Sequence, residues 1–445
     1  MGTALYLNCL RMLYGEAHAV EIHVVQAGET LWNLAGQYGV ASYSSIMGVN
    51  LLPSMKIVPG QTLLIPTGWQ SYVVMPGDTL SDIASRYGLR TSELQAWNPW
   101  MQGKTPPVGY ILRLPTVARR GKTALGFLEL ISPSIDRLNV LNNDPYYTYL
   151  ALFTYGMTES GMITSATDVT ALQLMTQAQT LPAATFSNWT LDRFSPDAAH
   201  LVLSSASLRR QYLSEVLRIV LEKGYKAVTI DFESLHEGDR AAFVEFLREL
   251  SIRLRPLRIP SIVCLMPITE QLPYEAPIIQ AYDYAGIAAN ADFVMLMSYN
   301  WSWPGGPPGP IASLKLVDAN IRYALARMSR TQILLGLVRY GYDWALPYQQ
   351  GETTGTFAVQ TVVELAMKNQ LPITFDMQSL TPSFSYWDTQ GRPHVVWFED
   401  ARSIQLKLQL VRKYDLAGIA AWELSEHFPQ FTQLLTDNFL ILRPS

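Results

Sequence analysis

The sequence is poor in cysteine, histidine and charged residues. Its 445 residues include two cysteines and six histidines, and only 16% of them are charged. Two cysteines, Cys9 and Cys264, cannot build a disulfide framework, and so few thiols and imidazoles leave little from which to build a metal site. Cys264 lies inside the apolar run from Ile262 to Met266, which favours a buried, inert thiol.

The sequence also lacks an excess of one charge and a long apolar run. Its 33 basic and 37 acidic residues nearly balance, which argues against a nucleic-acid partner. No apolar run reaches the roughly 18 residues of a membrane helix. Residues 1–10 have no basic residue before their apolar stretch, so they make a poor signal peptide. A hydrophobic fraction of 49% excludes disorder as the dominant state, and the 49 aromatic residues (11 Trp, 23 Tyr, 15 Phe) offer flat faces for stacking on sugars.

An internal repeat occupies the first part of the chain. Val24–Gly39 returns as Val73–Gly88, 49 residues later, and each copy closes with a short apolar run that ends in proline. The Thr of each Gly-Glu/Asp-Thr segment can cap the helix that follows it, in which apolar residues recur at helical spacing. With a second helix over 43–49 or 91–97 and a closing strand, each copy predicts a β-α-α-β module. The predicted modules cover residues 22–67 and 71–116.

From residue 122 onward, apolar runs alternate with amphipathic stretches typical of helices. Several runs lack the alternation of an antiparallel sheet, as expected of parallel strands covered by helices. Eight runs in about 320 residues favour an α/β fold, a (β/α)8 TIM barrel over 122–445. A doubly wound open sheet is the alternative, although no glycine-rich phosphate loop follows any run. Residues 374–396 break the alternation and predict a small α+β insertion. The predicted strands are 125–130, 147–155, 171–176, 227–233, 261–268, 293–299, 333–340 and 418–422.

Two carboxylates end the fourth predicted strand. Thr229, Asp231 and Glu233 alternate with apolar residues, so all three share one face of the strand. In a barrel of this kind, function lies at the C-terminal ends of the strands. Burying two carboxylates there costs free energy of folding, so they are expected to take part in the reaction or to pair with positive groups. Their proximity raises the proton affinity of one of them, which suits a general acid. A salt-bridged strand end is the alternative interpretation.

Several segments resemble glycoside hydrolase family 18, the chitinase-like barrels. Thr229–Glu233 is similar to the end of the family signature DxxDxDxE, although Lys226 and Thr229 stand where its first two acids would be. Met297–Asn300 resembles the MxYD end of the sixth strand, with Asn in place of Asp. The following segments are similar to the spore branch of the family and to its eighth-strand tryptophan: Tyr340–Trp344 (YGYDW, in the seventh strand), Trp397–Ser403 (WFEDARS) and Trp422.

The resemblance implies a role for each matched residue. Glu233 would protonate the leaving oxygen and later activate water. The acetamide of the substrate would act as nucleophile, an exception to the two-carboxylate scheme. Asp231 would hold the acetamide N–H and stabilise the oxazolinium cation, and Tyr299 would orient the acetamide oxygen. Trp422 would form the floor on which the sugar stacks. Asn300, Tyr342, Asp343 and Glu399 are the other implied substrate contacts.

The two repeats resemble LysM modules, which bind N-acetylglucosamine in peptidoglycan or chitin. The glycan-binding positions implied by this resemblance lie at the turn before each first helix. They are Gly28, Glu29 and Thr30 in the first repeat, and Gly77, Asp78 and Thr79 in the second. The same residues would also serve as turn and cap in a purely structural role.

The sequence therefore predicts an N-acetylglucosaminidase that cleaves β-1,4 bonds of peptidoglycan with retention of configuration. It predicts no metal or organic cofactor, no membrane span and no nucleic-acid partner, and a monomer located in the spore coat, the cortex or the cell wall. A non-hydrolytic wall-binding protein with a degenerate barrel and a chitinase are the alternatives. Intact Asp231, Glu233 and Tyr299 favour an enzyme, and the segments similar to the spore branch favour peptidoglycan over chitin.

Overall fold

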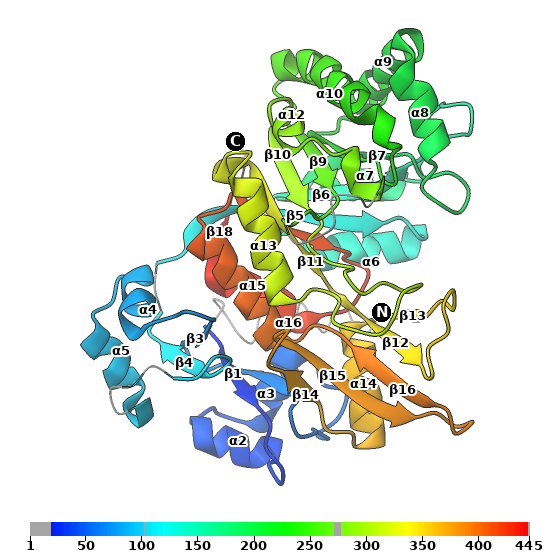
Figure 1. Ribbon diagram of the computed structural model, residues 1–445. Coiled ribbons are helices and arrows are strands. Elements are labelled where there is room, and N and C mark those ends of the chain that lie inside the picture. Colours follow the sequence, from blue (N-terminus) through cyan, green and yellow to red (C-terminus); the bar gives the residue numbers. More distant parts are fainter. Residues whose placement is uncertain (1–18, 102–103, 105, 117, 271–276, 444–445) are drawn as a thin grey trace.

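The computed structural model describes residues 19–101, 104, 106–116, 118–270 and 277–443 (Figure 1). Cys9 and the first ten residues lie outside the described residues. Eight parallel strands follow one another around a closed barrel, and the last strand pairs with the first. The predicted (β/α)8 barrel is therefore confirmed and the open sheet is excluded. The barrel strands are β5 (Arg120–Glu129), β6 (Tyr149–Tyr155), β7 (Leu181–Ser187), β8 (Ala227–Asp231), β9 (Ser261–Leu265), β10 (Phe293–Leu296), β11 (Ile333–Val338) and β17 (Gly418–Trp422).

Helices cover the outside of the barrel, so the strands are buried on both faces; all five residues of β8 are buried. The helix α9 (Ala206–Lys223) begins at Ser205, whose hydroxyl accepts from the Leu208 amide, and ends at Gly224 in the left-handed conformation. Other helices around the barrel are α6 (Pro133–Asn143), α8 (Pro196–Ser204), α10 (Arg240–Leu254), α12 (Tyr284–Ala288), α13 (Leu314–Leu325), α15 (Ala401–Lys413) and α16 (Pro429–Asn438).

The prediction for the third strand is wrong. Residues 171–176 fall largely in the helix α7 (Val169–Met175), where Ala171 and Met175 are buried one turn apart. The third barrel strand is β7, which has proline at position 182 and two alanines, all weak strand formers. Pairing with β6 on one side and β8 on the other places this segment in the barrel despite its low intrinsic preference.

The insertion is larger than predicted and begins directly after β11. It is a five-stranded antiparallel sheet in the order β13-β12-β16-β15-β14, together with the helix α14 (Val359–Asn369). The motif Tyr340–Trp344 lies in β12 of this sheet and not in the seventh barrel strand. Only Arg339 separates the apolar run of β11 from the aromatic run of β12, so the sequence gives little sign of the change of sheet. The strands are β12 (Tyr340–Ala345), β13 (Gly355–Ala358), β14 (Thr374–Asp376), β15 (Thr381–Trp387) and β16 (Pro393–Trp397).

Each repeat folds into the predicted β-α-α-β arrangement, with its two strands paired antiparallel. Thr30 and Thr79 cap the first helix of each repeat by accepting from the amides of Asn33 and Asp82. We call the two repeats module 1 and module 2. Module 1 contains β1 (Glu21–Val24), α2 (Leu31–Tyr38), α3 (Tyr43–Asn50) and β2 (Thr62–Ile65), and module 2 contains β3 (Gln70–Val73), α4 (Leu80–Arg86), α5 (Thr91–Trp97) and β4 (Ile111–Leu114).

Both modules pack against α15 and α16 of the barrel (Figure 1). Gln409 exchanges two hydrogen bonds with the backbone of Val73 in β3, at 2.8 and 2.7 Å, and Gln405 donates to the Ser71 carbonyl at 3.0 Å. Each side chain therefore satisfies backbone groups of module 2 inside the protein. Every residue of α15 from Ala401 to Arg412 is buried, because the modules cover the face that a barrel helix normally turns to water.

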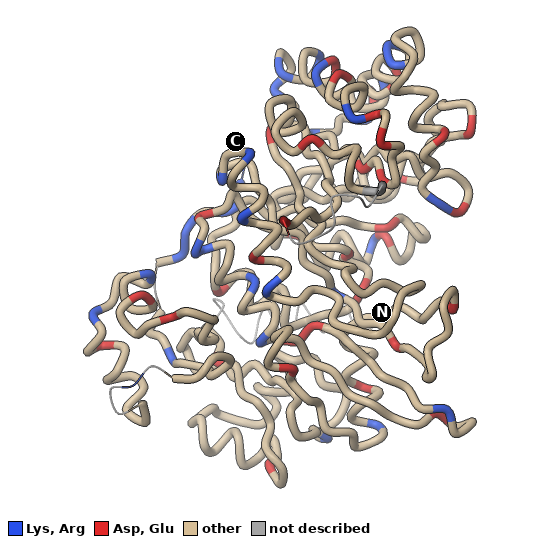
Figure 2. The backbone as a smooth tube through the Cα atoms, viewed as in Figure 1, with Lys and Arg blue, Asp and Glu red and all other residues tan. Residues whose placement is uncertain are grey.

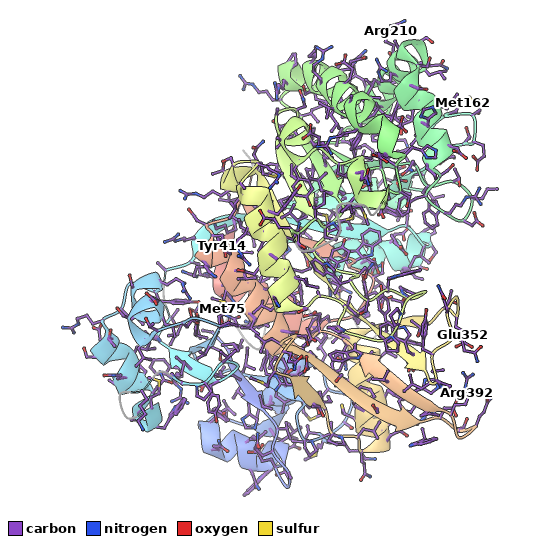
Figure 3. All side chains as sticks on the ribbon, in the orientation of Figure 1. Met75, Met162, Arg210, Glu352, Arg392 and Tyr414 are labelled. Atoms are coloured by element: carbon purple, nitrogen blue, oxygen red, sulfur yellow. The ribbon has the colours of Figure 1, made fainter. Side chains whose placement is uncertain are left out.

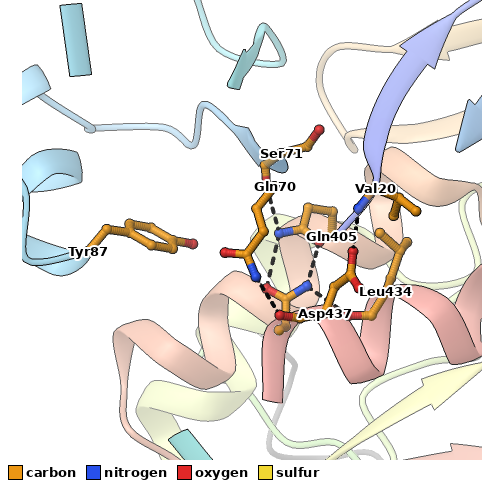
Figure 4. Close-up of a pocket in the computed structure, with 8 residues that line it drawn as sticks. Val20, Gln70, Ser71, Tyr87, Gln405, Leu434 and Asp437 are labelled. Carbon is orange, nitrogen blue, oxygen red and sulfur yellow. Dashed lines mark hydrogen bonds between the residues drawn. The ribbon is translucent and has the colours of Figure 1, made fainter. Parts of the chain in front are cut away.

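A small polar cavity lies at this junction (Figure 4). Beside it, the Val20 amide donates to the Asp437 carboxylate at 2.8 Å, and Gln70 donates to the Asp437 carbonyl at 2.6 Å. The residues that line the cavity come from the modules, α15 and α16, and none of them belongs to the end of a barrel strand. The cavity is thus a feature of the docked modules and separate from the catalytic end of the barrel.

Charged side chains of both signs are interspersed along the chain (Figure 2). In Figure 3, Arg210 on α9 and Arg392 in the hairpin between β15 and β16 lie at opposite ends of the view. The barrel helices around α9 and the inserted sheet are therefore well separated regions of the protein. The insertion borders module 1, where the Ile373 amide donates to the Pro59 carbonyl at 2.8 Å (Figure 1).

We expect the double variant Gln405→Ala, Gln409→Ala to lower the free energy of unfolding by about 1–3 kcal/mol for each buried backbone group left unpaired. Chemical denaturation followed by fluorescence measures this change. Gln350→Ala is the matched control, because Gln350 is exposed. An unchanged unfolding midpoint in the double variant would show that these glutamines do not hold module 2 on the barrel.

Candidate active site

The two carboxylates lie at the end of the barrel where the strands finish, which we call the mouth. Asp231 is the last residue of β8 and is 4% exposed, whereas Glu233 follows two residues later and is half-buried. Among the described residues, Asp231 Oδ1 has no hydrogen-bond partner. Thr229, one inward position below Asp231, is fully buried. The mouth therefore contains a buried carboxylate with an unsatisfied oxygen beside a second, more accessible one.

Burial changes the acidity of both groups. It raises the pKa of Asp231 to about 7. Burial and the charge of Asp231 hold the pKa of Glu233 well above its usual range. The two groups titrate as a pair, because each proton affects the other site. Glu233 consequently keeps its proton at neutral pH and can donate it, while the negative charge of the pair resides on Asp231.

Tyr299 joins this pair from the loop that follows β10. Its side chain is buried, and that burial, together with the nearby negative charge of the carboxylate pair, holds its pKa well above its usual value. Gly336 leaves room for the ring, because a Cβ there would come within 2.9 Å of Tyr299 Cε1. The structure thus brings together all three residues to which the sequence analysis assigns catalytic roles.

Trp422 ends β17 at the same end of the barrel. Its indole contacts the rings of Phe127 and Phe153 edge to face, at centroid distances of 5.3 and 5.0 Å. The side chain is half-buried, so these two rings fix its orientation while part of its surface remains accessible. This position suits an aromatic floor at the mouth.

Asn300 connects the sixth barrel strand to the inserted sheet. Its side-chain oxygen accepts from the hydroxyls of Tyr340 and Tyr342, both at 2.8 Å. Asn300 itself is exposed and adopts the left-handed backbone conformation, with φ of 59°. Because Asn300 directly follows Tyr299 in the chain, the hydrogen bond from Tyr342 connects β12 to the loop that carries Tyr299. Tyr342 therefore reaches the mouth from β12 rather than from a barrel strand.

The structure does not bring Asp343 and Glu399 to the mouth. Asp343 follows Tyr342 along β12 and so points to the opposite face of the sheet, where it accepts from Tyr386 at 2.6 Å and from His394 at 2.8 Å. Glu399 is fully buried and forms an ion pair with Lys407 at 2.7 Å. Both carboxylates have protein partners, although Glu399 Oε1 has none among the described residues.

The implied glycan-binding residues of the modules form an exposed turn before each first helix. Gly28 and Gly77 adopt positive φ values of 85° and 80°, which favour glycine. Glu29 accepts from His23 at 2.7 Å, and Asp78 forms an ion pair with Arg86 at 3.2 Å. Both carboxylates therefore stabilise the conformation of their turns. Thr30 and Thr79, the caps, are exposed.

An exposed aromatic residue marks the turn of module 1. Trp32, two residues after Thr30, is 70% exposed, whereas the equivalent position of module 2 is Ser81. A large aromatic face in water beside the turn is suited to stacking on a sugar. The two modules therefore differ at the position next to the shared turn.

Asn188 is a residue of the site that the sequence analysis missed. It follows β7, is fully buried, and exchanges hydrogen bonds with the Glu233 backbone, donating to its carbonyl and accepting from its amide, both at 2.8 Å. It also donates to the Ser195 carbonyl at 3.0 Å. The amide side chain thus fixes the backbone that carries Glu233. Its place at the end of a strand would have identified it, had the third strand been assigned correctly.

Within the described ranges, no cluster of three or more His, Cys, Asp or Glu side chains could hold a metal ion. In the same part of the chain, no helix has the length and apolar character that crossing a membrane requires.

Comparison with known proteins connects this geometry to a family. The model of glycosyl hydrolases family 18 matches residues 185–427, and the LysM domain model matches residues 23–66 and 72–115. The chain is 35% identical to Bacillus subtilis YdhD, named as a candidate sporulation-specific glycosylase, over 94% of this chain and 99% of that protein. It is 31% identical to the cortical fragment-lytic enzyme of Bacillus cereus, over 95% of this chain and 99% of that enzyme.

A solved structure gives the same result in three dimensions. The Bacillus cereus spore cortex-lytic enzyme SleL superposes with a TM-score of 0.85 at 31% identity, covering 96% of this chain and 99% of that one. The similarity therefore extends over the modules, the barrel and the insertion.

We expect Asn188→Ala to lower kcat for glycan hydrolysis by about 10- to 100-fold while KM changes little, because a misplaced acid impairs the chemical step more than binding. Steady-state kinetics on soluble glycan fragments measures both constants. Asn369→Ala, at the exposed end of α14, is the control. A change confined to KM would contradict a role for Asn188 in placing Glu233.

Proposed function

The chain belongs to glycosyl hydrolases family 18, and we propose that it cleaves β-1,4 N-acetylglucosaminyl bonds in the peptidoglycan of the spore cortex or cell wall. It is a glycoside hydrolase whose LysM modules bind N-acetylglucosamine polymers such as peptidoglycan. The observation that carries the finer proposal is the meeting of Asp231, Glu233 and Tyr299 at one mouth. The relatives named for cortex lysis support the spore cortex as substrate.

In the proposed reaction the sugar supplies its own nucleophile. Asp231 and Glu233 are two residues apart at the end of one strand and share a direction, so they do not flank a glycosidic bond from opposite sides. Glu233 donates its proton to the leaving oxygen as the acetamide oxygen of the substrate attacks the anomeric carbon. Asp231 then stabilises the positive oxazolinium ring, and Tyr299 orients the acetamide by a hydrogen bond.

The second half of the reaction regenerates the enzyme. Glu233, now ionised, removes a proton from water. The water oxygen attacks the anomeric carbon and opens the oxazolinium ring. Two successive inversions at one carbon retain its configuration. Trp422 supports the distorted sugar from below, and Asn300 and Tyr342 line the side of the mouth nearest the insertion. A proton from water therefore replaces, within each cycle, the proton that Glu233 gives to the leaving oxygen.

We propose domain boundaries of 22–67 and 71–116 for the targeting modules and 122–445 for the catalytic barrel. In this proposal the turns around Gly28 and Gly77 bind the glycan, and Trp32 stacks on it beside the first turn. We also propose that the protein is a monomer located in the spore coat, the cortex or the wall, which is consistent with glycan binding by the modules. Because the modules dock on α15, they present a bound glycan in a fixed orientation relative to the mouth.

We expect Glu233→Gln to lower kcat for release of reducing ends from cortex fragments by at least about 10²-fold, because the amide cannot donate the proton. Retention on insoluble peptidoglycan should be unchanged, since the modules are intact. Glu237→Gln, an exposed carboxylate four residues later, is the matched control. A loss of less than about tenfold in Glu233→Gln would refute Glu233 as the general acid.

A further inference from the structure

The peptide group that joins Phe232 to Glu233 lies beyond the end of the strand pairing. The register of β8 ends at Asp231 on the β7 side and at Ile230 on the β9 side. Ser234, which follows the acid, has a positive φ of 55°, so the chain leaves the extended conformation there. Because regular pairing stops before Glu233, side chains have to satisfy the backbone that carries the general acid.

Side chains from two sides bond to this one peptide group. Its N–H donates to the side-chain oxygen of Asn188, at 2.8 Å, from the segment that follows β7. Its carbonyl accepts from the Tyr282 hydroxyl, also at 2.8 Å, from the segment between α11 (Pro277–Gln280) and α12. The two partners come from opposite sides of β8, because β7 and β9 flank that strand in the barrel. The peptide group is thus held at both of its polar atoms.

The packing around Tyr282 fixes the direction of its hydroxyl. The side chain is 1% exposed, and its ring meets the ring of Phe243 on α10 edge to face, at a centroid distance of 6.2 Å. Phe243 in turn stacks on the ring of Phe232, at 6.0 Å. Burial and the nearby charge of the carboxylate pair hold the pKa of Tyr282 well above its usual value, so the hydroxyl keeps its proton and acts as a donor.

Two other buried donors near the acids do not share this contact. Cys264 on β9 is buried, as predicted, and its thiol donates to the thioether of Met295 at 3.8 Å. Tyr212 on α9 lies beside the same Phe232 ring, at a centroid distance of 6.2 Å, but its hydroxyl has no hydrogen-bond partner among the described residues. The bond to the Phe232 carbonyl therefore distinguishes Tyr282 from its neighbours.

We propose that Tyr282 is a positioning residue for the reaction, which together with Asn188 clamps the peptide group before Glu233 and so aims the general acid at the leaving oxygen. The inference deepens the proposed function and rests on it. The Cα atom of Glu233 is attached directly to the nitrogen of this peptide group, so rotation of the group moves the whole side chain. A small misplacement of an acid is enough to slow proton donation. The sugar contact at Trp422 comes from another strand and is unaffected.

The first test compares two leaving groups in the full chain. Tyr282→Phe removes the hydroxyl and keeps the ring, so kcat/KM for soluble cortex fragments should fall by about two- to tenfold, the range for one lost hydrogen bond. For a para-nitrophenyl β-glycoside of N-acetylglucosamine, kcat/KM should be unchanged, because the nitrophenolate leaves without help from an acid. Tyr212→Phe is the matched control, since it removes a hydroxyl without a partner beside the same ring.

The pattern of losses separates a positioning role from a general loss of packing. Equal losses of Tyr282→Phe on both substrates, or an unchanged kcat/KM on cortex fragments, would overturn the proposal. The same comparison with Glu233→Gln tests the proposed function separately. If Glu233→Gln shows no dependence on the leaving group, the proposed function falls, and the inference falls with it. If Glu233→Gln shows that dependence and Tyr282→Phe does not, only the inference is rejected.

The second test observes the contact itself and does not depend on catalysis. Labelling phenylalanine carbonyl carbons with ¹³C and glutamate nitrogens with ¹⁵N selects the peptide groups in which Glu follows Phe, which are Phe232–Glu233 and Phe398–Glu399. In the NMR spectrum, Tyr282→Phe should lower the carbonyl chemical shift of Phe232, because this carbonyl loses its donor. The signal of Phe398 serves as internal reference and should stay in place. A Phe232 signal that does not move would refute the contact.

Discussion

Asp231 and Glu233 cannot both carry a full negative charge where they lie, because burial removes them from water and the charge of Asp231 raises the proton affinity of Glu233. One proton is therefore retained by the pair at neutral pH. Asn188 fixes the backbone that carries Glu233, by accepting from its amide and donating to its carbonyl. The chemistry follows from this shared proton, since an acid and a charged stabiliser then exist side by side.

The junction with module 2 is built from specific polar contacts. Glutamine side chains of α15 bond directly to the backbone of β3, and the Asp437 and Arg412 side chains are buried beside them. Such contacts fix orientation, because a carboxamide must match a backbone amide and carbonyl together. These contacts hold module 2 in one orientation relative to the barrel.

The repeats, the barrel class and the acid-bearing strand could be predicted from the sequence, because each depends on local periodicity. The third strand could not, since Pro182 and two alanines hide β7 while residues 171–176 imitate a strand. The boundary between β11 and β12 was not predicted either, because only Arg339 separates these two runs of apolar and aromatic residues. Motif similarity alone also grouped Tyr342 with Asp343, although neighbouring residues of a strand face opposite sides, and only Tyr342 reaches Asn300. Side-chain direction and long-range pairing decide such cases.

Substrate-assisted catalysis is the central claim, and the configuration of the first product tests it most directly. A short β-1,4-linked N-acetylglucosamine oligomer is hydrolysed in an NMR tube, and the anomeric proton of the new reducing end is observed before mutarotation. The account predicts the β-anomer, because the acetamide and then water each invert the same carbon. The α-anomer as first product would mean direct attack by water, and would contradict the roles assigned to Asp231, Glu233 and Tyr299.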